Sequence, residues 1–248
     1  MIVWEKWRKK SRYREVATVC FPLMMSMAAV TVMEFTDRIF LSNYSVDAIA
    51  AALPAGIAAL LVMAFFSGVA GYTSVFIAQY CGAGAYERIG STLWQGIYFS
   101  IFSGVLAAVF SSLIALPLFT LAGHALEIQH LERIYFKILC WGSVLHIGNH
   151  ALSAFFTGRG ITRAVMMING LGMAFNIPLD YVLINGVWVF PELGITGAAI
   201  ATVASWGLIT LLFSLLIFTR LNQKKYLVHN LAFDSNIFTR LMRFGVPG

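Results

Sequence analysis

The sequence predicts an all-α, polytopic membrane protein, and three observations support this. Of its 248 residues, 59% are hydrophobic and only 11% are charged, whereas soluble domains contain about 25% charged residues. The mean hydropathy is +0.80. Long apolar segments recur along the chain, and most basic residues lie between them. Because this small number of charged side chains cannot cover a water-facing surface, we expect the chain to lie in a lipid bilayer.

Six apolar segments are long enough to cross a bilayer as helices, which takes about 20 residues each. They are residues 15–41, 47–80, 89–120, 131–156, 161–187 and 193–219. Residues 1–14 are a basic N-terminus that does not have the pattern of a cleavable signal peptide. After the six-helix lobe, 15–219, residues 220–234 form a polar linker and residues 235–248 are predicted to begin a seventh helix. This organisation indicates the first half of a transporter built from two similar lobes.

The distribution of positive charge predicts the orientation, because cytoplasmic loops carry an excess of Lys and Arg. With the N-terminus in the cytoplasm, 14 of the 17 basic residues fall on the cytoplasmic side. These are Lys6, Arg8, Lys9, Lys10, Arg12, Arg14, Arg88, Arg159, Arg163, Arg220, Lys224, Lys225, Arg240 and Arg243. We therefore expect a cytoplasmic N-terminus in the inner or plasma membrane. The net charge of +6 then reflects topology, and no nucleic-acid partner is expected.

Asn176 and Asp180 are the most informative residues, because both lie inside an apolar segment. They are four residues apart and share one helix face. Pro178 lies between them and displaces the carbonyl of Ala174 from the helical hydrogen-bond ladder. An amide, a carboxylate and a free carbonyl suit Na⁺, and the carboxylate alone can bind a proton. Ionisable groups inside a membrane are rare and usually functional. The alternative is that Asp180 only bonds to a neighbouring helix near the outer surface.

Asp37 is a second candidate, at the outer end of the first segment. With the predicted topology, it lies at a depth similar to that of Asp180, and Thr202 of the sixth segment comes near the same level. Glu34 and Arg38 are four residues apart, so they can form an ordinary interfacial ion pair; alternatively, Glu34 lines a cavity.

Two prolines lie in the first two segments. Pro22 in the first and Pro54 in the second are expected to kink their helices, which is useful for gating, although membrane helices often tolerate proline.

The sequence gives little support for a metal site or for catalysis. His146 and His150 are four residues apart, but a metal site needs three or four ligands, and no carboxylate or cysteine stands at a suitable spacing. We expect these histidines to be structural or to line a cavity. No nucleophile–base pair is evident, so the protein is not expected to be an enzyme. No cofactor is expected, and no metal beyond a possible Na⁺.

Several motifs together resemble the N-terminal half of the multidrug and toxic compound extrusion (MATE) family, within the multidrug/oligosaccharidyl-lipid/polysaccharide exporter superfamily. They are residues 35–41, 78–84, 155–160, 176–181, 191–202 and 243–248. The resemblance implies a twelve-helix exporter with two six-helix lobes around a central cavity. It also implies export of small organic cations, often aromatic, in exchange for Na⁺ or H⁺. In members with a cation site in this lobe, its positions match Asp37, Asn176, Asp180 and Thr202.

Two other functions stay open at this point. A flippase for lipid-linked precursors, from the same superfamily, would need a strongly cationic cavity, whereas the charges inside these segments are mainly acidic. A non-transporting partner subunit is the other alternative. For an exporter, the expected partners are the lipid bilayer and a second six-helix lobe in the same full-length chain.

Overall fold

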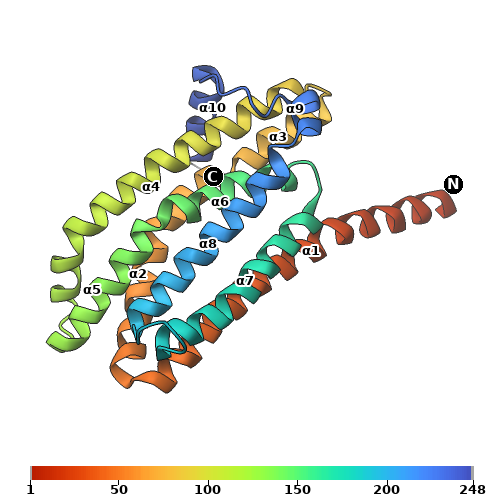
Figure 1. Ribbon diagram of the computed structural model, residues 1–248. Helices are drawn as coiled ribbons and strands as arrows, with labels where there is room; N and C mark the ends of the chain where they lie inside the picture. Colours follow the sequence, from red (N-terminus) through yellow and green to blue (C-terminus); the bar gives the residue numbers. More distant parts are fainter. Residues whose placement is uncertain (1, 247–248) are drawn as a thin grey trace.

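A computed structural model describes residues 2–246, with the side chains of residues 13, 14 and 16–246. The described part of the chain is helical, without strands (Figure 1). The helices are α1 (Ile2–Tyr44), α2 (Val46–Gly71), α3 (Thr73–Gly82), α4 (Glu87–Leu121), α5 (Leu126–Trp141), α6 (Ser143–Thr157), α7 (Thr162–Asn185), α8 (Ile195–Ile217), α9 (Arg220–Tyr226) and α10 (Ser235–Gly245). The prediction of an all-α protein is confirmed.

Five segments of the described chain are long and apolar enough to cross a membrane. They are Val16–Tyr44, Val46–Gly82, Glu87–Leu121, Thr162–Asn185 and Ile195–Ile217, and they correspond to five of the six predicted spans. Many of their large apolar side chains are exposed, such as Phe102 (68%), Leu61 (70%) and Leu113 (72%). Such surfaces are stable against lipid, so the protein is a multi-pass membrane protein.

The fourth predicted span, 131–156, is not one uninterrupted helix. It is divided at Gly142 into α5, with 16 residues, and α6, with 15 residues. The break lies where the chain crosses α8 closely, because a Cβ on Gly142 would stand 2.5 Å from a methyl group of Val203. α5 also carries Glu132, Arg133 and Lys137, which lowers its hydropathy. The second predicted span, 47–80, is likewise interrupted, at Tyr72 between α2 and α3.

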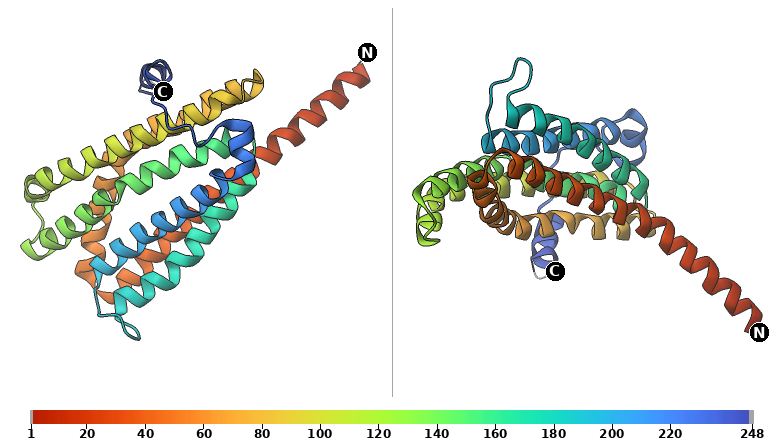
Figure 2. Two further views of the ribbon diagram at one scale, coloured as in Figure 1. Left: turned by 45° about the horizontal axis from the view of Figure 1, so that its top comes forward. Right: turned by 90° about the horizontal axis from the view of Figure 1, so that it is seen from below.

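Two groups of neighbouring helices organise the bundle (Figure 1). In one group, α4 packs along α5 and α6, and α2 packs against both. In the other, α1 packs along α7, and α7 packs against α8, which also contacts α5 and α6. The first part of α1, residues 2–14, continues the helix beyond the other helices in both views of Figure 2. The side chains of Lys6, Arg8, Lys9, Lys10 and Arg12 in this basic N-terminus lie outside the described side chains.

The predicted linker, 220–234, is docked on the bundle. It contains α9 and an irregular segment that α4 holds by three side-chain hydrogen bonds to backbone carbonyls. Trp94 donates to Val228 (2.7 Å), Tyr98 to Leu231 (2.5 Å) and Gln95 to Ala232 (3.3 Å).

The region predicted to begin a seventh helix contains α10. Its apolar residues Ile237 and Leu241 are buried, and Phe238 and Met242 pack against a core cluster beneath. Pro247 and Gly248 lie outside the described residues. The domain boundaries themselves stay a prediction.

Candidate functional site

Three helices bring the predicted site residues together. Asp37 lies on α1, Asn176 and Asp180 on α7, and Thr202 on α8, and α7 is in contact with both neighbours. The approach of α8 to α7 depends on Gly197, where a Cβ would stand 2.5 Å from the carbonyl oxygen of Leu183. Small residues of this kind allow membrane helices to pack closely.

All four side chains are buried. Asn176 and Asp180 are 0% exposed, Asp37 is 4% exposed and Thr202 is 6% exposed. The Thr202 hydroxyl stands 3.1 Å from Asp37 Oδ2 and 3.0 Å from the carbonyl of Ala198, and it can donate to either. Its bond to Asp37 joins α1 to α8. The Asp37 and Asp180 carboxyl groups lie within interaction range of each other, as do Asp180 and Asn176. These contacts bring the four side chains near one another, and their action as one site stays a prediction.

Five polar atoms of this group have no hydrogen-bond partner. They are Asp37 Oδ1, both side-chain polar atoms of Asn176 and both carboxylate oxygens of Asp180. A buried polar atom without a partner costs about 1–3 kcal/mol, and native proteins contain few. Several unpartnered polar atoms in one group are typical of a site where a bound ligand supplies the missing partners.

The chemistry of these atoms is that of a cation site. Two carboxyl groups that share a buried site cannot both be ionised cheaply, because like charges repel strongly where water is excluded. A proton on one carboxyl group, or a hard cation between them, relieves that repulsion. Carboxylate and amide oxygens are also the ligands that hard cations prefer. The residues present therefore fit either H⁺ or Na⁺, and the binding of either ion stays a prediction.

The three prolines singled out in the sequence lie inside continuous helices. α7 continues through Pro178, two residues before Asp180, α1 continues through Pro22, which is buried, and α2 continues through Pro54. Because proline cannot donate a backbone hydrogen bond, it weakens the ladder at each place. Their role in gating stays a prediction.

A cavity of about 90 Å³ opens beside the site, between α1, α2, α5, α6 and α8. Asp37 and Thr202 form part of its wall, whereas Asn176 and Asp180 do not. Asp37 and Thr202 therefore belong both to the cavity wall and to the buried group.

The expected ion pair between Glu34 and Arg38 is absent among the described side chains, where the one contact between a basic and an acidic group joins His124 Nδ1 to Glu132 Oε1 (2.7 Å). Glu34 and Arg38 instead both line the cavity. Glu34 is exposed and Arg38 half-buried, so water or a ligand can solvate each charge without a direct contact.

Sequence reasoning did not identify two aromatic residues of the cavity wall, Tyr135 and Trp206. A signal was present for Trp206, because it follows Thr202 by four residues and shares its helix face. His146, expected to be structural or cavity-lining, does line the cavity, and its ring lies 4.7 Å from that of Trp206. The ring of His150 is 5.2 Å from that of His146.

The comparisons with known proteins agree with one another. The family model named MatE matches residues 22–182. The probable multidrug resistance protein NorM of Listeria innocua is 27% identical over 87% of this chain and 47% of its own length. The probable multidrug resistance protein YoeA of Bacillus subtilis is 28% identical over 99% of this chain and 54% of its own length. The chain thus spans about half the length of the curated relatives it matches.

Two solved structures show the same fold. One is described as the outward-facing conformation of a multidrug resistance MATE family transporter of the MOP superfamily. It superposes with a TM-score of 0.83 at 23% identity, over 94% of this chain and 51% of its own. The other is a MOP superfamily transporter from Pyrococcus furiosus, with a TM-score of 0.82 at 23% identity and the same coverage.

Proposed function

Because the chain belongs to the MatE family, we propose that it acts as the N-terminal lobe of a secondary antiporter that exports organic compounds in exchange for Na⁺ or H⁺. The relatives that it matches are named as multidrug resistance proteins, and the chain corresponds to about half of each. Its partner would be a second six-helix lobe, and its location the inner or plasma membrane with the N-terminus in the cytoplasm.

The buried cluster of unpartnered polar atoms carries the coupling part of this proposal. Asp37, Asn176, Asp180 and Thr202 would bind the coupling cation, since five of their polar atoms have no protein partner. Asp180 would hold the charge of the ion at the deepest point, where it is 0% exposed. Thr202 would orient Asp37 by its hydrogen bond.

The position of Asp37 suggests how cation binding would affect the substrate. Its carboxyl group belongs both to the cavity wall and to the buried cluster. Neutralising the repulsion between Asp37 and Asp180 would let α1 change its position against α7 and α8. α1 is the helix best suited to such a movement, because it packs mainly against α7 and has few contacts with α8.

The lining of the cavity supports a cationic, partly aromatic substrate class. Glu34 and Asp37 supply negative charge, and Tyr135 and Trp206 supply aromatic faces, on which cations are attracted by the ring quadrupole. Arg38 also lines the cavity and would exclude the most highly charged cations.

The test is an Asp180→Asn substitution, which preserves shape and removes the charge. We expect cation-driven dye efflux to be abolished in cells that carry both lobes, and ²²Na⁺ or proton binding by the purified chain to be lost, with normal membrane insertion. Asp47→Asn is the matched control, because Asp47 is an exposed acid at the start of α2. Unchanged efflux and binding in the Asp180 variant would refute the site.

A further inference from the structure

A second cluster of charged side chains lies away from the cation site, at the end of the bundle where α9 and α10 meet α4 (Figure 1). Its members are four cations, each of which stands over an aromatic ring and comes from a different segment. They are Arg88 near the start of α4, Arg159 in the turn between α6 and α7, Lys225 on α9 and Arg240 on α10. We call these four residues the basic cluster.

One pair of these cations shares the ring of Tyr226. The Arg159 guanidinium lies 3.7 Å from the ring centre of Phe155 and 4.7 Å from that of Tyr226. Lys225 Nζ lies 4.9 Å from the ring centre of Tyr86 and 5.3 Å from that of Tyr226. The rings of Tyr86 and Phe155 both contact Tyr226 edge-on, so the platform beneath these cations is itself packed.

The second pair shares Tyr80. Arg88 stands 5.8 Å from the centre of its ring. Arg240 donates a hydrogen bond to its hydroxyl (3.3 Å) and lies 5.2 Å from the ring centre of Phe76. Tyr80 packs against the same core cluster that contains Tyr226, so both pairs lie over one part of the core.

None of the four cations forms an ion pair with a described carboxylate. The nearest acids in sequence are Glu87, which is exposed, and Asp234, whose carboxylate accepts from the backbone N–H groups of Asn236 and Ile237 at the start of α10. An aromatic ring holds a cation in position without neutralising its charge. The basic cluster therefore presents a preorganised positive charge that is still available to an anion.

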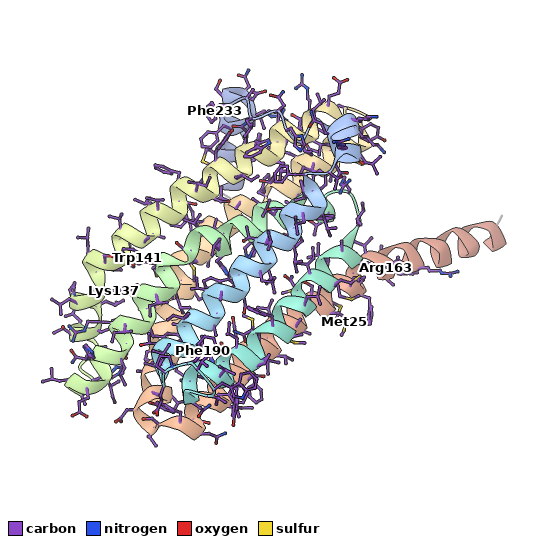
Figure 3. The ribbon with its side chains drawn as sticks, in the orientation of Figure 1. Met25, Lys137, Trp141, Arg163, Phe190 and Phe233 are labelled. Atoms are coloured by element: carbon purple, nitrogen blue, oxygen red, sulfur yellow. The ribbon has the colours of Figure 1, made fainter. Side chains whose placement is uncertain are left out.

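The surroundings indicate that this anion belongs to a lipid. Arg88, Lys225 and Arg240 are exposed. Arg88 lies at the start of the membrane-crossing segment Glu87–Leu121, and Lys225 lies on the short helix that follows the segment Ile195–Ile217. The same linker exposes large apolar side chains: Leu221 (81%), Leu231 (58%) and Phe233 (60%). Phe233 is labelled in Figure 3 beside α10. Basic and apolar side chains side by side are the composition of a segment that lies at the boundary of headgroups and acyl chains.

We propose that the basic cluster binds the phosphate group of an anionic phospholipid. The headgroup would bridge the start of α4, the α6–α7 turn, α9 and α10. Because α9 and α10 follow the last long span of this lobe, the bound lipid would fasten the linker to the bundle. The proposal depends on the membrane location of the chain and not on its transport activity.

The test is lipid binding by the purified 248-residue chain in detergent, measured by native mass spectrometry during titration with phosphatidylglycerol or phosphatidylcholine of equal chain length. We expect phosphatidylglycerol to bind more tightly. The double variant Arg88→Gln/Lys225→Gln should lose affinity for it by roughly 30-fold, since each basic residue near a lipid surface contributes about 1 kcal/mol. Adding Arg159→Gln should weaken binding further, although Arg159 also bonds to the Phe155 carbonyl, so the double variant is the primary test.

The control is Arg133→Gln/Lys137→Gln, which removes the same charge from α5, where Figure 3 shows Lys137 far from α9 and α10. Its affinity for phosphatidylglycerol should be unchanged. An equal loss in this control, or equal binding of the two lipids by the unmodified chain, would overturn the proposal. Complete displacement of the lipid by millimolar inorganic phosphate would assign the cluster to a free anion and would equally overturn it.

Discussion

Replacing Gly197 by alanine should move α8 away from α7 and disturb the candidate cation site. The added Cβ would stand 2.5 Å from the Leu183 carbonyl oxygen and 3.0 Å from the backbone nitrogen of Ile184. Both are backbone atoms, so no side chain can rotate away. Ordinary contact begins at 3.4 Å, and α8 must therefore shift by about 1 Å.

The cost of this shift can be worked from the contacts that it breaks. Two backbone hydrogen bonds, Leu193 to Leu183 (3.0 Å) and Gly194 to Ile184 (3.2 Å), close the α7–α8 connection. Each contributes about 1 kcal/mol, and overpacking adds about 1–3 kcal/mol. Alanine recovers about 1 kcal/mol through its helix propensity. The net destabilisation of about 2–4 kcal/mol corresponds to a Tm lower by roughly 4–16 °C.

The assay is thermal unfolding of the purified chain in detergent, with Gly207→Ala as the matched control. Gly207 lies on the same helix, and a Cβ there would meet only Leu145 Cδ1, at 3.8 Å. This variant should therefore be as stable as the unmodified protein or slightly more stable. A Tm for Gly197→Ala equal to or above that of Gly207→Ala would refute the close approach of α7 and α8, and with it the placement of Thr202.

Two further predictions follow from single hydrogen bonds. Thr202→Val keeps the side-chain shape and removes the hydrogen bond to Asp37, and a buried acceptor left without its donor costs about 1–3 kcal/mol. Cation affinity measured by ²²Na⁺ or proton binding should therefore fall roughly 5- to 150-fold, and an unchanged affinity would exclude Thr202 from the site. Trp94→Phe removes the hydrogen bond to the Val228 carbonyl and should speed backbone hydrogen exchange in residues 227–233. The control Trp141→Phe removes an exposed hydrogen bond and should leave that exchange unchanged. Equal exchange in the two variants would contradict the docking of the linker on α4.

The candidate cation site was predictable because each residue stands out against its own segment. An acid or an amide within an apolar span is costly, so Asp37, Asn176 and Asp180 are conspicuous in the sequence alone. Topology then predicts a similar depth for them and Thr202, and in the structure Thr202 is hydrogen-bonded to Asp37. Tyr135 does not stand out in this way, because aromatic residues are common in membrane helices, and Trp206 is marked only by its spacing of four residues from Thr202.

The pairing of Glu34 with Arg38 shows where local spacing misleads. Residues four apart on a helix can meet, but here both side chains line a cavity formed by four other helices as well.

The division of the fourth predicted span also depends on contacts between helices. Gly142 is one of 21 glycines, and only the position of Val203 on α8 marks it as a point of close contact.

The amino-acid pattern alone identifies a helical membrane protein, five of its membrane-crossing segments and the polar residues that are exceptional within them. Those properties depend on the transfer of about 20 consecutive residues from water to lipid, which is a local quantity. The tertiary structure alone decided how each helix is rotated, where α5 and α6 separate and how the linker docks on α4. Lipid and the protein interior are similarly apolar, so hydrophobic periodicity hardly distinguishes the two sides of a membrane helix, and only close contacts between helices set their arrangement.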